Sequence, residues 1–311
     1  MTDLIHDDQL TLTAPGRQDE TTPARRPTVS ICVPAYQAEQ HLRPTVESLL
    51  AQEYDDFEVV IVDNHSSDAT SAIVESFADV RVRLVRNDAT VPIIDNFNRA
   101  VGLCRGEFVK LVCADDVIAP GCIATQADIL RRFPTVALVG ALTDFIDSDG
   151  ELLRPARGLR GIKGHRSAQH VVRTLVRSGT NPIGAPVATM FRRADFDRTG
   201  GFRDDVELFY SDADLWVRLL QHGDFYGVPE VLASFRFGCD TVSATMAARS
   251  QIVQQGQFTR RLAADSRWTI SSVDHAVGRL NAYEKQVRRT MLFALSRRRA
   301  SRRRSARTPS A

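Results

Sequence analysis

Acidic and polar side chains stand directly after two apolar runs of this sequence. Asp115 and Asp116 follow one run, and Asp63 and Asn64 end another. Adjacent carboxylates offer the oxygen ligands that a divalent cation such as Mg²⁺ prefers. A carboxylate beside an amide can instead form paired hydrogen bonds with the edge of a nucleobase. Turns before the next helix use the same residue types, with Asp63 and Asn64 in an Asx turn, so both interpretations stay open.

Two more aspartates, Asp212 and Asp214, lie at the start of a segment with helical spacing, 211–220. A carboxylate exposed at such a place can act as a general base and take a proton from a hydroxyl group. The same position suits a helix cap, and it complements the positive end of the helix dipole. We expect Asp214 to cap the helix, and for Asp212 both roles remain open.

The elements that must position these residues follow from the hydrophobic pattern. Apolar, β-branched runs predict strands, and the amphipathic segments between them predict helices. The predicted strands are 28–34, 57–63, 81–88 and 107–113, and the predicted helices are 38–52, 66–79 and 91–104. This alternation indicates βαβ units and a mostly parallel sheet, in which ligands bind beyond the carboxyl ends of the strands. The polar groups after each strand should therefore meet at one edge.

The second half of the chain mixes strand and helix patterns. Residues 136–153 predict a strand, a turn and a second strand, and residues from about 244 to 299 predict helices. Three aspartates, at 144, 147 and 149, hint at a calcium loop, but no glutamate follows at the spacing that such loops need, so a hairpin turn is favoured.

Composition limits the class of protein. The chain has 311 residues, of which 43% are hydrophobic and 25% charged, as in ordinary globular proteins. No apolar run approaches the roughly 20 residues that span a bilayer, and the N-terminus has no apolar signal core, which predicts a cytoplasmic protein. The odd number of cysteines, without CxxC spacing, argues against disulfides or zinc. Cys32 and Cys113 lie in strand-like runs and are expected in the core.

Charge is unevenly distributed along the chain. The net charge is +2, but from Lys285 to the end there are ten basic residues and no acidic ones, which leaves −8 on the remainder. The segment 285–304 joins an apolar patch to arginines and could lie on an anionic membrane at the inner face of the plasma membrane. The alternative is a last docked helix with a solvated end. No pattern indicates nucleic-acid binding.

Taken in order, four motifs resemble the family 2 glycosyltransferases. They are Pro34-Ala35-Tyr36, then VIVDNHSSDAT, then NFNRAVGLCRGEFVKLVCADD, then GGF…YSDADLWVRL, and the match extends from about residue 28 to 237. The resemblance implies a GT-A α/β fold with a mostly parallel central sheet flanked by helices. It also implies transfer of a sugar, with inversion, from a nucleotide-diphosphate sugar to a hydroxyl of a carbohydrate or lipid-linked acceptor, in cell-surface polysaccharide or glycolipid synthesis.

The resemblance also assigns roles to individual residues. Asp116 would bind a Mg or Mn ion, and Asp115 would bind the ribose or the same metal. Asp212 would be the catalytic base. The residues assigned to the nucleotide sugar are Pro34, Ala35, Tyr36, Asp63, Asn64 and Asn96. A tyrosine packed over a loop and an asparagine on a solvated helix surface are the alternatives for Tyr36 and Asn96.

Three positions depart from the family pattern. Cys113 stands where the first aspartate of the metal motif is usual, Ser211 replaces a glutamate before the base, and Gly238 replaces a histidine that helps to hold the metal. Asp240 is a weak substitute for that histidine. These departures favour an alternative, a catalytically silent relative that acts as a binding subunit. A nucleotidyltransferase is less favoured, because no glycine-rich basic loop follows the first strand.

The domain organisation follows from these patterns. We expect four parts, namely a disordered tail (1–26), a GT-A domain (27–240), a helical extension (241–299) and a disordered basic tail (300–311).

Overall fold

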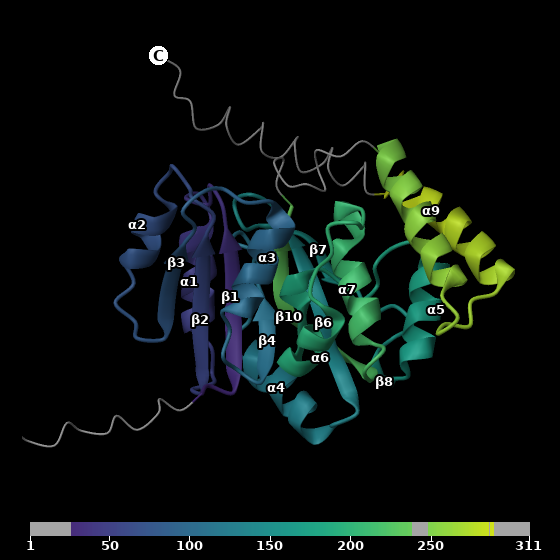
Figure 1. Cartoon of the computed structure of the whole chain (residues 1–311), viewed down its shortest axis with the longest axis horizontal. Coiled ribbons are helices and arrows are strands. Elements are labelled where there is room, and N and C mark those ends of the chain that lie inside the picture. The colour runs from purple at the N-terminus through teal and green to yellow at the C-terminus, as the bar shows by residue number, and fades with distance from the viewer. Residues whose placement is uncertain (1–25, 238–247, 286, 289–311) are drawn as a thin grey trace, which may run out of the picture.

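A single ten-stranded sheet runs through the molecule (Figure 1). The computed structural model describes residues 26–237, 248–285 and 287–288. The strands are β1 (Val29–Ala35), β2 (Phe57–Asp63), β3 (Val82–Arg86), β4 (Phe108–Leu111), β5 (Val117–Ile118), β6 (Val136–Ile146), β7 (Leu152–Arg157), β8 (Gly164–Arg166), β9 (Thr189–Arg192) and β10 (Asp224–Arg236). The main path through the sheet is β3-β2-β1-β4-β9-β6-β10-β5, with β7 paired to β6 and β8 to β10.

The four predicted N-terminal strands are present and pair in parallel. Ala35 at the end of β1 pairs with Asp63 at the end of β2, so the residues that follow both strands leave the sheet at the same edge. The chain crosses from β1 to β2 in one direction and from β3 to β4 in the other. The order of the strands therefore reverses between β1 and β4, and in such sheets this switch point is where ligands bind.

The second half of the sheet is mixed. β9 lies antiparallel between β4 and β6, and β6 and β7 form the predicted hairpin, whereas β6 and β10 are parallel. Asp147 accepts backbone N–H bonds from Asp149 and Glu151, which confirms the hairpin turn. The α/β fold class is confirmed, with parallel pairing in β3-β2-β1-β4 and in β6–β10.

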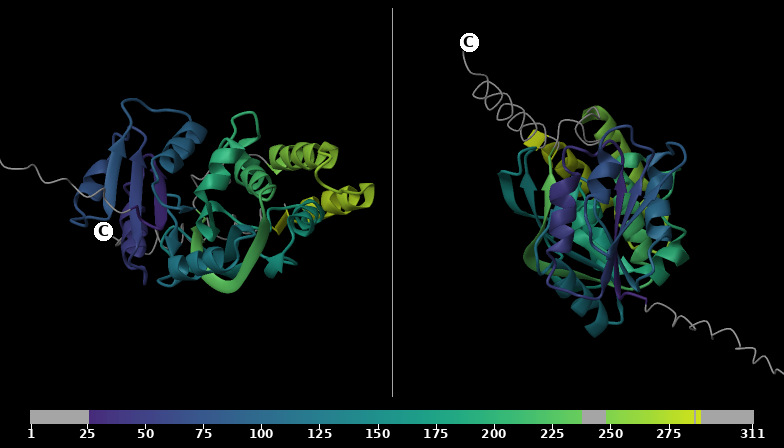
Figure 2. Two further views of the ribbon diagram at one scale, coloured as in Figure 1. Left: turned by 60° about the horizontal axis from the view of Figure 1, so that its bottom comes forward. Right: turned by 90° about the vertical axis from the view of Figure 1, so that its left-hand side faces the viewer.

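Helices cover both faces of the sheet (Figure 2). They are α1 (Leu42–Leu50), α2 (Thr70–Glu75), α3 (Ile93–Gly102), α4 (Cys122–Arg132), α5 (Ala168–Ser178), α6 (Arg193–Thr199), α7 (Ser211–Leu219) and α9 (Ala248–Ala264), with short 3₁₀ turns η1 (Pro186–Ala188) and η2 (Leu208–Tyr210). Ile31 and Val33 face the cluster with α1 and α4, and Cys32 faces the cluster with α3 and α7. Alternate strand residues thus fill two cores, as β geometry requires.

The C-terminal part is helical, as predicted, over α9 and residues 272–285. The helix 272–285 packs against the end of α5, at the opposite end of the molecule from β3 (Figure 1). A Cβ atom on Gly278 would lie 2.1 Å from the Val176 oxygen, and one on Gly179 would lie 2.4 Å from the Ala282 nitrogen. Gly179 also has φ 65°, the left-handed geometry that ends many helices. The two backbones are therefore in direct contact.

Asp274 fastens this helix to α5. Its carboxylate is 1% exposed and pairs with Arg177 at 2.6 Å and with Arg173 at 3.1 Å, and it accepts hydrogen bonds from Ser271 as a capping box. Burial alone would raise the pKa of Asp274, but the hydrogen bonds from Arg177 and Ser271 outweigh it and hold the pKa well below its usual range.

Asp274→Ala should lower the free energy of unfolding by about 2 kcal/mol at pH 7, because a buried paired carboxylate is lost while its arginines stay half-exposed. Since the folded pKa is depressed, the difference from wild type should be complete above about pH 4 and should shrink as pH falls from there toward the folded pKa, because the unfolded chain takes up the proton first. Urea unfolding at several pH values measures it. Asp265→Ala, which removes a more exposed pair with Arg267, is the control and should cost less than 1 kcal/mol.

Several predictions fall outside the described residues. They concern the N-terminal tail, Gly238, Asp240 and the arginine-rich segment from 289 onward. Among the helices that the structure does describe, none combines the length and the apolar character needed to cross a bilayer. Cytoplasmic location and membrane contact by the tail stay predictions.

Candidate active site

One cavity of about 1990 Å³ opens at the carboxyl edge of the parallel strands. It brings together most of the residues that the sequence singled out, and the members that line it are Pro34, Ala35, Tyr36, Asn64, Asn96, Asp115 and Asp212. Two predicted residues, Asp63 and Asp116, are not part of the lining and lie buried beside it. The site thus forms at the β1/β4 switch point, where the topology predicts it.

Three candidate metal ligands follow β4. The side-chain ligand atoms of Cys113, Asp115 and Asp116 all lie within 4.8 Å of one another. Cys113 and Asp115 line the cavity, and Asp116 lies behind them with 1% of its surface exposed.

The Asp116 carboxylate is held at one oxygen only. Its Oδ1 accepts a 2.8 Å hydrogen bond from the backbone N–H of Arg236, whereas Oδ2 is buried and has no hydrogen-bond partner among the described residues. Burial, and then the nearby Asp115 carboxylate, raise the pKa of Asp116 well above its ordinary value. Burial likewise raises the pKa of Asp115. An unpartnered buried oxygen in a pair of like charges fits a bound cation.

Arg236 supports this pair through the backbone. Its guanidinium donates to the carbonyl oxygens of Asp115 at 2.8 Å and Asp147 at 2.9 Å. It therefore fixes the chain around the acid pair and adds positive charge that partly offsets theirs.

The expectation for Cys113 was wrong, whereas that for Cys32 is confirmed. Cys32 is fully buried, but Cys113 comes two residues after the end of β4 and lines the cavity. Burial, followed by the charges of Asp116 and Asp115, raises the pKa of the Cys113 thiol well above its ordinary value. The thiol thus stays protonated unless a cation displaces the proton. The apolar run continues to Cys113, whereas β4 ends at Leu111, so the pattern alone predicted a core position for this cysteine.

Tyr36, one of the residues predicted to bind the nucleotide sugar, lines one wall of the cavity and is 53% exposed. Asp63 is fully buried, and its oxygens accept hydrogen bonds from the Ser66 N–H at 3.0 Å and the Ser71 hydroxyl at 2.5 Å. The structure therefore shows the Asx-turn alternative for Asp63, with its carboxylate below the cavity. This turn also delays α2 until Thr70.

Three asparagines form a network under the same wall. Asn87 donates to the side-chain oxygens of Asn64 at 2.8 Å and Asn96 at 3.0 Å. Asn64 also pairs with both backbone groups of Val91, which holds the segment after β3 against the cavity. Asn96 is only 3% exposed, so the solvated-helix alternative for it is wrong. Asn87 carried no signal in the sequence, because a single asparagine in a loop is ordinary.

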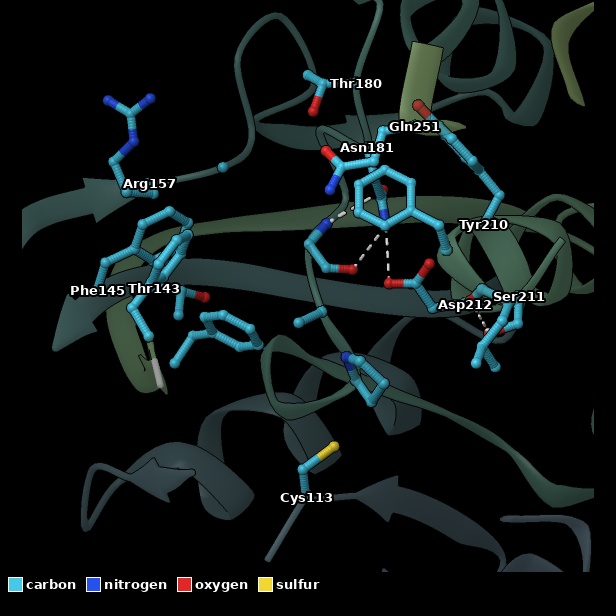
Figure 3. A pocket seen from close by; sticks show the side chains of 18 of the residues that line it. Cys113, Thr143, Phe145, Arg157, Thr180, Asn181, Tyr210, Ser211, Asp212 and Gln251 are labelled. Atoms are coloured by element: carbon cyan, nitrogen blue, oxygen red, sulfur yellow. Dashed lines mark hydrogen bonds between the residues drawn. The ribbon is translucent and has the colours of Figure 1, made fainter. Parts of the chain in front are cut away.

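Asp212 projects into the cavity from the first turn of α7 (Figure 3). Its Oδ1 accepts from the Ala213 N–H at 2.6 Å, and its Oδ2 accepts from the Asn181 side-chain amide at 3.2 Å. Figure 3 shows it between Cys113 on one side and Thr180 and Gln251 on the other. The Asp212 carboxylate therefore lies between the side of the cavity formed by Cys113 and the side formed by Thr180 and Gln251.

Asn181 is a second residue that the sequence did not reveal. Its oxygen accepts from the N–H groups of Ile183 and Gly184, and its amide donates to the Gly184 carbonyl as well as to Asp212. The side chain thus fixes its own loop and orients the Asp212 carboxylate, 31 positions away.

For the roles that the family resemblance implies, Asn181→Ala should lower the rate of sugar transfer about tenfold while leaving affinity for the nucleotide sugar within about twofold, because one hydrogen bond that orients the predicted base Asp212 is lost. Steady-state kinetics on both substrates measures it. Asn181→Asp is informative as well, since it keeps the acceptor for the Ile183 and Gly184 N–H groups, loses the bond to the Gly184 carbonyl and places a second negative charge beside Asp212. A fall in donor affinity equal to the fall in rate would contradict a positioning role.

Asp214 has a different role from the predicted cap. It forms ion pairs with Arg218 at 2.7 Å and Arg203 at 3.6 Å, and no side-chain cap bond is present at the start of α7. Asp214 therefore stabilises the helix that carries Asp212.

The far wall of the cavity comes from elements that the sequence could not place. It includes Tyr210 of η2, Gln251 of α9, Asn281 of helix 272–285 and Arg157 of β7. Tyr210 stacks on Phe258 of α9 with ring centroids 5.0 Å apart, which joins α9 to the start of α7. The helical extension thus completes the site.

Comparison with known proteins agrees with this geometry. The family described as "Glycosyl transferase family 2" matches residues 30–200. An uncharacterised protein of Mycobacterium tuberculosis, MT1568, is 30% identical over 249 residues, covering 77% of each chain. The succinoglycan biosynthesis protein ExoO of Rhizobium meliloti is 37% identical over 128 residues, which are 41% of this chain and 36% of ExoO.

A solved structure shows the same fold. The mannosyltransferase PcManGT of Pyrobaculum calidifontis, in complex with GDP-Man and Mn²⁺, aligns with a TM-score of 0.55 and 20% identity over 93% of this chain and 78% of its own. The matched family covers more than half of the chain, and its segment includes β1, β2, β4 and the acid pair. The chain belongs to the family 2 glycosyltransferases and is a glycosyltransferase with a GT-A fold.

Proposed function

We propose that the protein transfers a sugar from a nucleotide-diphosphate sugar to an acceptor hydroxyl by a single displacement that inverts the anomeric centre. The observation that carries the proposal is that the acid pair after β4 and Asp212 on α7 line or adjoin one cavity, with Asp212 between its two ends. ExoO and PcManGT support a role in making polysaccharide or glycolipid from a nucleotide sugar.

The donor end has residues for each part of the nucleotide. Tyr36, with Pro34 and Ala35 beneath it, forms an apolar wall on which a base can stack. Asn64 shapes the opposite side by holding Val91, and Asn96 presents a buried amide toward the sugar or diphosphate. Asp63 contributes from below, by fixing the turn that carries Asn64.

A divalent metal, Mg or Mn, fits the group formed by Asp116, Asp115 and Cys113. The free Oδ2 of Asp116 is its natural ligand atom, and Asp115 reaches the cavity beside it, where it can also meet the ribose. When bound, the metal would neutralise the charge of the leaving diphosphate. Cys113 would offer a sulfur as a third ligand in place of an oxygen, once its thiol loses its proton.

Residues of the chain itself would remove the proton from the acceptor hydroxyl. Asp212 accepts the proton of the acceptor hydroxyl as the new bond forms, and Asn181 and the Ala213 N–H hold its carboxylate in place. The walls from α9 and helix 272–285 hold the acceptor and exclude water from the reacting atoms.

A thermal-shift screen of nucleoside diphosphates and their sugars, with and without Mn²⁺, tests the proposal. Ligand binding to the folded state raises the unfolding temperature in proportion to the logarithm of ligand concentration over Kd. We expect a metal-dependent shift with one nucleobase. A folded protein that shifts with none would favour the catalytically silent relative instead.

A further inference from the structure

Basic side chains line the cavity on β7 and the turn after it, on α5 and on the C-terminal helix, which are not the elements that carry the proposed donor residues. They are Arg154, Arg157, Arg160, Arg177, Lys285 and Arg288. Arg177 and Arg288 are paired, with Asp274 and Glu284. In the part of the chain that the structure describes, no carboxylate lies within ion-pair distance of the other four. Three of these four, Arg157, Arg160 and Lys285, are here called the basic cluster.

Two members of the basic cluster are carried by a constrained segment. Ala156 and Leu159 have φ of 50° and 55°, a left-handed geometry that costs energy for residues other than glycine. Leu159 is fully buried, and its N–H donates to the Pro182 carbonyl at 2.7 Å. The buried Leu159 thus anchors a strained turn. Arg157 and Arg160, on either side of it in the sequence, are exposed and line the cavity. Such strain persists where the surrounding structure enforces it.

Lys285 reaches the same place from a separate element, the helix 272–285. Burial lowers the pKa of Lys285, and the charges of Arg288, Arg160 and Arg157 lower it further, while Glu284 opposes them. Lys285, Arg157 and Arg160 all line the one cavity. The close packing of that helix on α5 fixes this arrangement.

We propose that the acceptor carries a phosphate group, and that Arg157, Arg160 and Lys285 bind it so that the acceptor hydroxyl meets Asp212. The inference rests on the proposed transferase function. Guanidinium groups donate in a fork that matches phosphate oxygens, and two of them beside an ammonium suit a doubly charged group. The basic cluster lines the same cavity as Asp212, which favours an acceptor chain over a membrane surface.

The test measures binding of a fluorescently labelled short polyphosphate in EDTA, by anisotropy, without donor. EDTA removes any metal, so the acid pair does not attract the probe. We expect saturable binding to wild type and weakening by about tenfold or more in Arg157→Gln/Arg160→Gln, because each lost charged hydrogen bond is worth roughly tenfold. Lys285→Gln should weaken binding in the same direction.

Arg132→Gln is the matched control. Arg132 is an exposed arginine on α4, outside the cavity, and its removal should change the probe's Kd by less than about twofold. Equal weakening in the control, or no saturable binding to wild type, would overturn the proposal. A third result would also overturn it, namely a double variant that loses the binding to phosphatidylglycerol vesicles seen in wild type but still binds polyphosphate. The basic cluster would then bind a membrane.

The nucleotide thermal shift separates this inference from the proposed function. The double variant should keep the Mn²⁺-dependent shift of wild type, because neither arginine adjoins the donor residues. A wild-type protein that binds polyphosphate but shows no nucleotide shift would contradict the transferase proposal alone.

Discussion

Asp212→Asn should lower the rate of sugar transfer by about 100- to 10,000-fold, the usual contribution of a general base. Asparagine keeps an oxygen to accept from the Ala213 N–H, so the start of α7 should remain folded. It cannot take the proton of the acceptor hydroxyl. The rate is measured as sugar transfer, or as hydrolysis of the donor where no acceptor is supplied. Calorimetry measures donor affinity, which should stay within about twofold of the wild-type value.

Asp214→Asn is the matched control for that experiment, two residues along the same turn. It removes the partner of Arg218 and Arg203, so it should lower stability. The rate per folded molecule should be close to that of wild type. If Asp212→Asn folded normally but lost donor binding, Asp212 would belong to the donor site and some other group would be the base.

Asp116→Asn should remove the metal dependence of donor binding. Its remaining oxygen still accepts from the Arg236 N–H, but the charged ligand is gone. Donor affinity in Mn²⁺ should fall by about 100-fold, to the value measured in EDTA, since even the loss of groups that support a metal ligand costs 10- to 100-fold. Asp147→Asn is the control, because Asp147 lies in the nearby hairpin and its carboxylate binds backbone N–H groups instead.

The same substitution should raise stability when no metal is present. The folded pKa of Asp116 is raised, so the folded state holds its proton more tightly than the unfolded chain does. Wild type therefore loses stability as pH rises from about 4 toward the raised pKa, and Asp116→Asn should lose less, because only Asp115 keeps a raised pKa. Thermal unfolding in EDTA at pH 4 and pH 7 measures the difference. A variant that is less stable than wild type at pH 7 would mean that the charge of Asp116 is already balanced by the protein.

Most residues of the proposed donor half could be predicted because they stand at or just after the end of a strand, with Asn96 on α3 as the exception. Apolar, β-branched runs locate β1, β2 and β4, and parallel pairing then brings their carboxyl ends together whatever the side chains do. The direction of a side chain is a different matter. Asp63 does not line the cavity, because its oxygens accept hydrogen bonds from Ser66 and Ser71. The alternation of strands and helices does not predict these bonds.

The contacts between separate loops and elements could not be predicted for a related reason. Asn181 acts on Asp212 across 31 positions, and Asn87 joins two residues that belong to separate elements. Such contacts depend on how loops fold back, and loops show no periodicity. Likewise the pattern from 244 onward predicts helices, but only their packing on α5 shows that they enclose the site.

The contact between Gly278 and Gly179 limits how wide the end of the cavity that we propose for the acceptor can be. Helix 272–285 contributes Lys285 and Asn281 to the cavity, and its backbone is in direct contact with that of α5. A single methyl group at either glycine would push that wall outward and carry Lys285 with it. On the proposed function, the size of acceptor that fits is therefore limited by two positions at which a side chain is absent.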